Sequence, residues 1–351
     1  MATGTIQPGL DSMVHCIRNA IAAKFLLVAL ENDLFTWLAE PKSPAEIAEH
    51  FGWLPGPTDK FCEILAYLGL IAMRGEKVRN TEQAGTLLNK ASQGNVVAFL
   101  LESCKWCLEP LDHLPGVLRN GPVLPERDTD SEALWHEIVA CGASMAFENS
   151  GKIVADRLAS LAGADNFRRM LDLGGGHGVF SLYAAEALPD LAADVYDLPP
   201  ALRSAARHIE ERGFAGRVKI LPGDYIREDL PNGYDLVFAS CTLNFTLMDG
   251  RIQKVMDKAH AALVPGGYCV SLHDTPPDAA GKGGSYLSGD SGIAAYPVEC
   301  LAFGLVSGMD MAMPEGLVAE TMLQSGFPFV HSRELRTSGG TFRLDVARKG
   351  G

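Results

Sequence analysis

The sequence predicts a doubly wound α/β fold preceded by a smaller, mainly helical domain. Two observations predict the α/β part: an apolar strand runs into a glycine-rich turn at Gly174, and strands then alternate with helical segments toward the end of the chain. Helical periodicity in the first part of the chain predicts the other domain. We expect a helical domain over residues 1–94, a helical connector over 95–165 and the α/β domain over 166–351.

Length and composition agree with two domains that each bury a sizeable core. The chain has 351 residues, of which 47% are hydrophobic and 21% charged. No apolar stretch is expected to span a membrane and no signal peptide is expected, so the sequence predicts a cytoplasmic protein. The net charge of -13 disfavours nucleic acid and anionic membranes as partners. Eight scattered cysteines fit reduced thiols.

The N-terminal domain is predicted to combine helices with a small wing. Apolar residues repeat at helical spacing over 13–38, and Ser43–Glu46 is a capping box that opens a short helix. Thr58 is placed to cap a further helix, and residues 69–81 form the wing. The candidate recognition helix, residues 59–65, is acidic and apolar rather than basic. This composition indicates dimerisation and not entry into a DNA groove.

The connector is predicted to be helical over 95–118 and 131–161, with a proline- and charge-rich crossing between these segments. Cys104 and Cys107 have the spacing of a paired metal ligand. Because no second CxxC and no histidine pair accompanies them, we predict no metal site.

Seven strands are expected in the α/β domain. The first is the apolar run that ends at Leu173, and the last two form an antiparallel hairpin turned by Ser338-Gly339-Gly340. The remaining expected strands are 191–197, 217–222, 234–240 and 268–272, and the hairpin strands are 327–335 and 341–347.

The glycine-rich turn after the first strand indicates a nucleoside-like cofactor. Such a turn points backbone N–H groups and a helix N-terminus at an anionic group of the ligand. Its glycines at 174, 176 and 178 give Gly-x-Gly-x-Gly, whereas a dinucleotide fingerprint would need the third glycine at Val179. NAD is therefore disfavoured, and the shorter turn suits S-adenosylmethionine. Asp197, at the end of the second strand, is expected to hold the ribose hydroxyls, and Asp224 with Tyr225 to flank the adenine.

The motifs DLGGGHG, YDLP, GDY and LVPGG occur in this order, and together they resemble the S-adenosylmethionine-dependent O-methyltransferase-like family over nearly the whole chain. The resemblance implies a Rossmann-like methyltransferase sheet, a small-molecule acceptor and a homodimer formed by an N-terminal winged-helix domain. It also implies that the cofactor is held by Asp172, Gly174, Gly175, Gly176, Gly178, Asp197, Leu198, Gly223, Asp224, Tyr225 and Ser240.

The acceptor pocket implied by the resemblance lies beside the connector. Its candidate wall residues are apolar or aromatic, for which ordinary core packing is the competing interpretation. They are Trp106, Met145, Phe147, Tyr286 and Met309.

The sequence departs from the family pattern at the general base. O-methylating members carry a histidine after the fourth strand, and Asn244 occupies that position here. An amide cannot remove a proton, and a positioned base contributes roughly 10²–10⁴-fold in rate. Either His273 with Asp274, at the end of the fifth strand, replaces the base, or the acceptor atom has no proton to lose. His273 would equally fit a plain structural role at a strand end.

Three hypotheses follow. The first is S-methylation of a thioether acid, as in the methylthiohydroxybutyrate S-methyltransferases of dimethylsulfoniopropionate synthesis, which the chain resembles in length, layout and the missing histidine. There the acceptor sulfur would attack the methyl carbon directly, with Asn244, Asp274, Trp106 and Tyr286 near the transfer line. The second is O-methylation of a phenolic or hydroxylated metabolite. The third is a regulator or binding protein that keeps the fold without catalysis.

Overall fold

The protein is described by a computed structural model that defines residues 10–92, 94–104, 108–122, 139, 143, 146, 150–247, 250–274, 302, 304–306, 313–337 and 340–351. These residues form two compact units, one within Gln7–Lys105 and the other beginning at Trp106.

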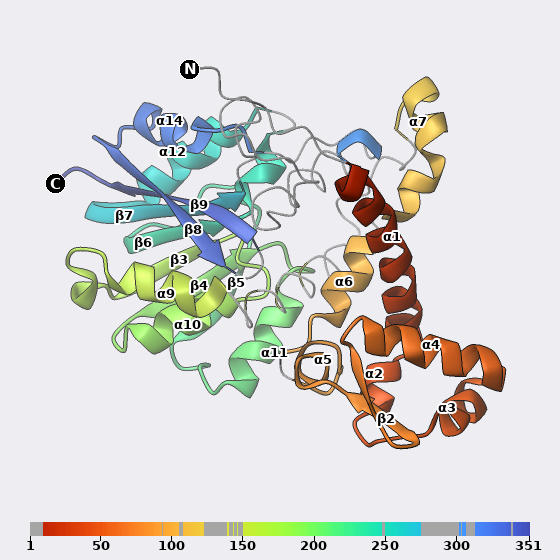
Figure 1. The fold of residues 1–351 in the computed structure, drawn as a ribbon. Helices are drawn as coiled ribbons and strands as arrows, with labels where there is room; N and C mark the ends of the chain where they lie inside the picture. Colours follow the sequence, from red (N-terminus) through yellow and green to blue (C-terminus); the bar gives the residue numbers. More distant parts are fainter. Residues whose placement is uncertain are drawn as a thin grey trace, which may run out of the picture. The chain divides into compact units, whose positions relative to one another are not determined.

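The C-terminal unit is built on a seven-stranded sheet of order β5-β4-β3-β6-β7-β9-β8 (Figure 1). Strands β3 to β7 run parallel to one another, and β9 pairs antiparallel with both β7 and β8. The chain therefore winds outward from β3 to β5, crosses back to β6, and ends in a hairpin. The strands are β3 (Arg169–Leu173), β4 (Ala192–Asp197), β5 (Val218–Pro222), β6 (Tyr234–Ser240), β7 (Leu263–Asp274), β8 (Val330–Thr337) and β9 (Gly340–Arg348).

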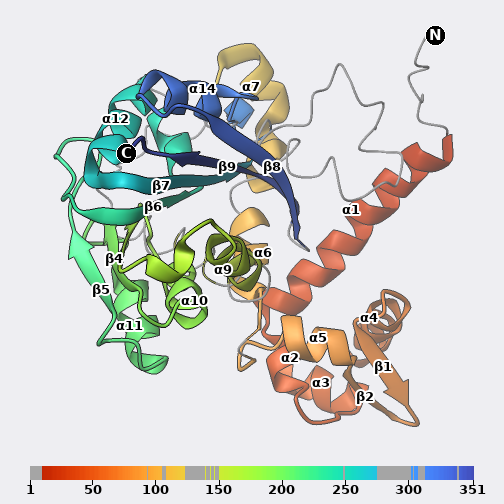
Figure 2. The ribbon, with the colours of Figure 1, turned by 90° about the vertical axis from the view of Figure 1, so that its left-hand side faces the viewer.

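Helices cover both faces of this sheet (Figure 2). Alternate strand residues point to opposite faces, so Met170 packs in one core layer and Leu171 in the other. One face carries α9 (Gly151–Ala159), α10 (Val179–Ala187) and α11 (Arg203–Glu211), and the other carries α12 (Ile252–Ala262) and α14 (Leu317–Gln324). Shorter elements are η2 (Glu109–His113), α7 (Leu114–Asn120), η4 (Ala164–Asn166) and η5 (Leu243–Thr246).

The predicted doubly wound sheet is confirmed, and all seven expected strands are present within a few residues of their expected bounds. The largest difference is β7, which begins at Leu263 rather than Tyr268. Pro265-Gly266-Gly267, which were expected to form a turn before the strand, lie within β7. The pairing of β7 with β6 is irregular there.

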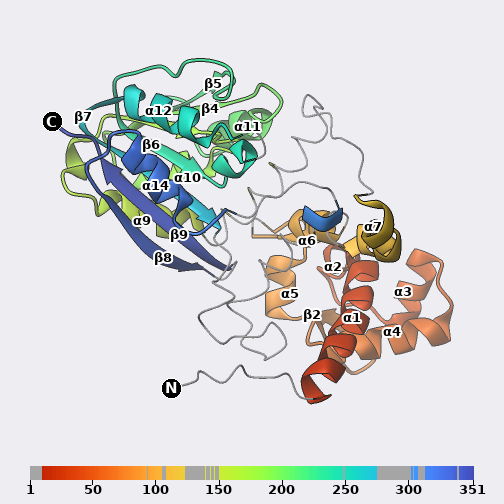
Figure 3. The ribbon, with the colours of Figure 1, turned by 90° about the horizontal axis from the view of Figure 1, so that it is seen from above.

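The N-terminal unit is a helical domain with a two-stranded wing. Helix α1 packs against α2, α4 and α6 (Figure 3). The elements are α1 (Leu10–Glu31), α2 (Leu34–Trp37), α3 (Pro44–Phe51), α4 (Pro55–Tyr67), β1 (Ile71–Arg74), β2 (Lys77–Asn80), α5 (Glu82–Leu87) and α6 (Val97–Ser103). The predicted capping box is confirmed, because the Glu46 N–H donates to Ser43 Oγ and the Ser43 N–H donates to the Glu46 carboxylate.

Three local predictions for the helical segments are wrong. The helix expected over 13–38 is broken at Asp33, whose φ of 56° lies in the left-handed region that aspartate tolerates better than most residues. Thr58 does not cap α4: the helix begins at Pro55, and the Thr58 hydroxyl donates to the Leu54 carbonyl at 2.9 Å. The helix expected over 95–118 is divided, with α6 and α7 as separate pieces.

Helix α1 also corrects the expectation that no apolar segment reaches membrane-spanning length. Met13–Glu31 is 19 residues long with a mean hydropathy of 1.6, and only 17% of its most apolar window is buried. Length and composition alone would let such a helix cross a membrane. The same properties fit a helix that packs against another protein surface.

Candidate active site

The predicted cofactor residues lie where the parallel strands β3, β4, β5 and β6 end. Asp172 is on β3, Asp197 ends β4, Gly223 follows β5 and Ser240 ends β6. The carboxyl ends of parallel strands meet at one edge of a sheet, and the winding direction reverses between β3 and β6. Ligands of doubly wound folds bind at this reversal point.

The glycine-rich turn between β3 and α10 has a backbone that only glycine accommodates at Gly174. Its φ is 66°, and a Cβ there would collide with the side chain of Thr242. The Gly174 N–H donates to the Tyr196 carbonyl at 2.8 Å, which holds the start of the turn against β4. Gly176 and Gly178 also have positive φ, of 39° and 70°. The turn therefore holds three glycines in backbone conformations that residues with side chains rarely adopt.

Asp172 is a buried carboxylate beneath this turn. It is 1% exposed, and its Oδ2 accepts a hydrogen bond from the Ser181 hydroxyl at 2.7 Å. Its Oδ1 has no hydrogen-bond partner among the described residues. Burial raises the pKa of Asp172 to about 7, against the effect of the Ser181 hydrogen bond. A ligand ammonium group would supply the missing partner of Oδ1.

Asp197 joins the turn to the end of β4. Its Oδ2 accepts from the Gly176 N–H at 2.9 Å and its Oδ1 accepts from the Leu198 N–H at 2.7 Å. Burial raises the pKa of Asp197 to about 6. Each carboxylate oxygen has a second lone pair, so hydrogen bonds from ribose hydroxyls remain compatible with this arrangement.

The turn after β5 carries the predicted adenine residues. Asp224 Oδ1 accepts from the N–H groups of Ile226 and Arg227, at 2.8 and 3.1 Å. The Tyr225 ring is 7% exposed, and its hydroxyl interacts with the carbonyl and the hydroxyl of Thr242. Most of the Tyr225 side chain is therefore core, and the turn presents its backbone and Asp224 as the polar part of the site.

Sequence reasoning missed Thr242, although it contacts two predicted site residues. Its side chain occupies the space that a Cβ on Gly174 would need, and its hydroxyl donates to the Tyr225 hydroxyl at 2.9 Å. The preceding residue, Cys241, has a φ of 51°, which is uncommon for a residue with a side chain. Strained backbone at the end of a central strand is typical of a functional site. Only the position of Thr242 just after the strand that ends at Ser240 could have signalled this from the sequence.

Asn244 lies in η5, in the segment after β6, and is 3% exposed. Its amide is thus buried close to the strand ends, as the family pattern implies. An amide orients and donates hydrogen bonds, but it does not take a proton at physiological pH.

His273 lies on β7, and its side chain is buried within the C-terminal unit. It is 1% exposed; its Nδ1 lies 3.3 Å from the Ser271 hydroxyl and its Nε2 lies 3.6 Å from Asp345 Oδ2. Burial lowers the pKa of His273 to about 4, and Asp345 only partly opposes this effect. A buried imidazole of low basicity is a poor general base at neutral pH. The geometry therefore disfavours His273 as the residue that deprotonates an acceptor. Asp274 ends β7 opposite Phe342, and its side chain lies outside the described residues.

We expect His273→Ala to weaken folding more than catalysis. Loss of the buried ring should lower the free energy of unfolding by about 1–3 kcal/mol. The turnover rate measured well below the melting temperature should stay within about threefold of the wild-type value. The same substitution at His331, which is exposed on β8, serves as the control. If turnover slowed by two orders of magnitude or more in His273→Ala alone, His273 would be restored as the base.

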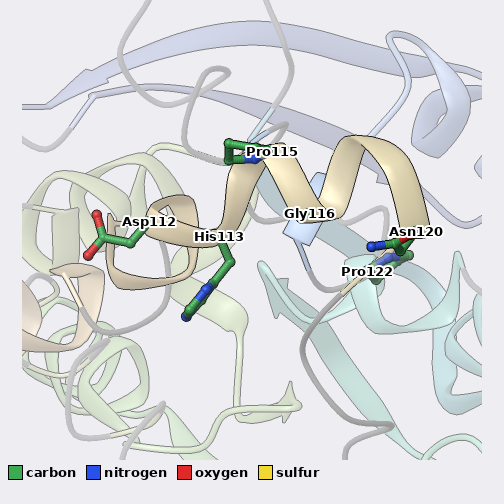
Figure 4. A pocket seen from close by; sticks show the side chains of 7 residues that line it. Asp112, His113, Pro115, Gly116, Asn120 and Pro122 are labelled. Carbon is green, nitrogen blue, oxygen red and sulfur yellow. The ribbon is translucent and has the colours of Figure 1, made fainter.

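The five predicted pocket residues, Trp106, Met145, Phe147, Tyr286 and Met309, lie outside the described residues. A separate hollow is lined by residues of η2 and α7 and by the two residues after them (Figure 4). His113 and Asn120 contribute polar atoms to it, but it contains none of the predicted site residues. Within the described parts of the chain, no group of three or more histidine, cysteine or acidic side chains could hold a metal ion.

Comparison with known proteins identifies the domain that carries this site. Residues 139–278 match the family model of the O-methyltransferase domain. The chain is 24% identical to acetylserotonin O-methyltransferase of Rattus norvegicus over 94% of its length and 75% of the relative. It is 26% identical to the tetracenomycin polyketide synthesis 8-O-methyl transferase TcmO of Streptomyces glaucescens, over 80% of this chain and 85% of that one.

Solved structures share the fold over nearly the whole chain. An O-methyltransferase family protein from Burkholderia thailandensis superimposes with a TM-score of 0.78 at 19% identity, covering 98% of this chain and 99% of its own. Human N-acetylserotonin methyltransferase in complex with SAM superimposes with a TM-score of 0.77 at 19% identity, covering 99% and 100%.

The fold, the glycine-rich turn and these matches define a methyltransferase that uses S-adenosylmethionine (SAM). Within that class, residues 139–278 match the model of the O-methyltransferase domain, and the chain is similar to relatives named for O-methylation. The residues of the site fit SAM, because the buried Asp172 Oδ1 lacks a partner there among the described residues and would accept a hydrogen bond from the methionine ammonium.

Proposed function

We propose that this enzyme methylates a hydroxyl oxygen of a small, hydroxylated and preferably phenolic metabolite. The observation that carries the proposal is the match of residues 139–278 to the O-methyltransferase domain. Several relatives are named for O-methylation, among them the 3-hydroxy-5-methyl-1-naphthoate 3-O-methyltransferase of Streptomyces sahachiroi, which is 25% identical over 69% of this chain.

When bound, SAM supplies a methyl carbon that is open to attack by a nucleophile. The chain's own residues bind and orient: Asp172 faces the methionine ammonium, the Gly174–Gly178 turn passes along the methionine part, and Asp197 holds the ribose. A phenol has a pKa near 10 and ionises far more readily than an alcohol. The Asn244 amide could donate a hydrogen bond to a phenolate, so this substitution favours a phenol over an aliphatic alcohol.

Asn244 also favours a second candidate, S-methylation of a thioether acid such as 4-methylthio-2-hydroxybutyrate. A thioether sulfur carries no proton, so it needs no base; it forms a bond to the methyl carbon as that carbon's bond to the cofactor sulfur breaks. The product is a sulfonium cation. Placement of the two sulfur atoms in line and exclusion of water would then account for catalysis, with the amide oxygen of Asn244 near the developing charge.

One experiment separates these candidates. The enzyme is incubated with methyl-labelled SAM and a panel of phenols, alcohols, thiols and thioethers, and the products are examined by mass spectrometry. O-methylation gives a neutral ether, with a rate that rises with pH as the phenol ionises. S-methylation gives a fixed cation at a rate that does not depend on acceptor ionisation. Turnover of thioethers far above phenols would replace our first proposal with the second.

We also propose that the enzyme is a homodimer that uses α1. Five apolar side chains recur at helical spacing on this helix and are 40–74% exposed: Leu10, Met13, Ile17, Ile21 and Val28. A row of exposed apolar side chains like this one, which also includes the exposed Lys24, is typical of a protein interface, and a second copy would cover it with an identical row.

We expect the double variant Ile17→Glu, Ile21→Glu to be monomeric, because two buried carboxylates per subunit would oppose association. Light scattering coupled to size exclusion measures the mass. Arg18→Glu, which places a glutamate on the same helix but beside the apolar row, is the control and should stay dimeric. A wild-type protein that is monomeric at all tested concentrations would contradict the proposal.

A further inference from the structure

We propose that Lys258 is a positioning residue for SAM: it holds the turn of residues 223–228 in the shape that receives the adenine. This inference rests on the proposed function of that turn. Lys258 lies on α12, in a part of the sequence that no cofactor motif includes. It acts through the backbone of the turn rather than by touching the cofactor.

The ammonium group of Lys258 donates to three backbone carbonyls of the turn. Its Nζ lies 3.1 Å from the Tyr225 oxygen, 3.2 Å from the Ile226 oxygen and 2.5 Å from the Glu228 oxygen. An ammonium has three N–H donors, so all of them are used. Hydrogen bonds from a charged donor are stronger than those between neutral groups. In helices and strands, backbone N–H groups donate hydrogen bonds to carbonyls of this kind. In this irregular turn the Lys258 ammonium donates them instead.

The turn is held from its other side by Tyr196 of β4. The Tyr196 hydroxyl donates to the Glu228 carboxylate at 3.4 Å, and burial raises the pKa of this phenol to about 12, so it stays a donor. A Cβ on Gly223 would collide with the Tyr196 ring, so the turn lies directly on that ring. The Gly223 N–H also donates to the Asp197 carbonyl at 3.0 Å.

These contacts connect Lys258 to the cofactor residues by a short path. Fixing the carbonyls of Tyr225 and Ile226 fixes the peptide that joins them, and the Ile226 N–H donates to Asp224 Oδ1. The Asp224 carboxylate is therefore oriented by a backbone that Lys258 holds. If the ammonium is removed, the turn should sample other conformations, and adenine binding would have to restore the order at a cost in affinity.

The test compares Lys258→Met with Lys254→Met, which removes an exposed lysine one turn earlier on the same helix. Binding of S-adenosylhomocysteine is measured by calorimetry, together with the KM for SAM and the kcat at saturating SAM. We expect Kd and KM to rise by about 10–100-fold in Lys258→Met, with kcat within about threefold of wild type, and no change in Lys254→Met. Tyr196→Phe, which removes only the hydroxyl, should raise Kd by about 2–5-fold.

A second measurement uses a cofactor analogue with an altered base. A variant that merely destabilised the fold would bind both analogues more weakly and would leave the preference between them unchanged. The preference for S-adenosylhomocysteine over S-inosylhomocysteine should fall in Lys258→Met, because the disturbed turn recognises the base. Equal Kd values and an unchanged preference in Lys258→Met and Lys254→Met, with wild type binding S-adenosylhomocysteine, would overturn the inference and leave the proposed function intact. A wild-type protein that binds no S-adenosylhomocysteine would overturn both.

Discussion

Replacing Gly174 with alanine should weaken SAM binding by at least about 100-fold, equivalent to about 2.7 kcal/mol or more. Two effects add. The φ of 66° costs an L-residue roughly 1–2 kcal/mol, and the new methyl group would overlap the Thr242 side chain. Thr242 cannot retreat freely, because its hydroxyl is bonded to Tyr225. The turn would have to move toward the space that the methionine part of the cofactor needs.

Gly213→Ala is the matched control for this prediction. Gly213 has a φ of 72°, almost the same as Gly174, but a Cβ there would meet no atom within 4 Å. The control therefore carries the backbone strain without the collision. Calorimetry with SAM and thermal unfolding are measured on both variants. If Gly174→Ala binds SAM as well as Gly213→Ala does, the proposed path of the cofactor along this turn is wrong.

The strands of the α/β domain could be predicted because each is a short apolar run bounded by turn residues, and alternation with helices restricts their order. The helical unit was predicted less well. Helical periodicity continues through Asp33, and only the left-handed backbone of that residue shows that the helix ends. At α4, two prolines precede Thr58, and they start the helix earlier than the threonine cap suggested.

The cofactor residues could be predicted where they form contiguous motifs, as at Gly174 and Asp197. The residues that support them could not, because their contacts join segments far apart in the chain. Thr242 reaches Gly174 from the end of a different strand, and Lys258 reaches the turn at Tyr225 from a helix that follows later in the chain. For His273 the sequence left a catalytic and a structural role open, and the burial of its ring beside Asp345, where β7 pairs with β9, favours the structural role.

The second large effect expected is a loss of SAM affinity in mild acid. Asp172 and Asp197 have pKa values raised to about 7 and about 6 by burial, and the ligand ammonium and hydroxyls need them ionised. Between about pH 7.5 and 5.5 the ionised fraction should fall about 25-fold for Asp172 and about fourfold for Asp197. If both must ionise, Kd should rise roughly 100-fold over this range, in which the ammonium of the ligand is mostly protonated throughout.

The stability of the free protein should depend on pH in the opposite way to SAM affinity. As the pH rises, SAM affinity should increase, whereas the contribution of these two carboxyl groups to stability should decrease. A carboxylate whose pKa is higher in the folded state than in the unfolded state binds its proton more tightly when folded. Its contribution is therefore complete below about pH 4 and is lost as the pH rises through about 6 to 7. These two groups should lower the melting temperature of the free protein over that range, while the increase in melting temperature on adding SAM grows. Asp172→Asn, which cannot ionise, should bind SAM weakly and with little dependence on pH above about 6.5. A Kd that is flat over the same pH range in the wild type would mean that neither carboxylate is coupled to the cofactor.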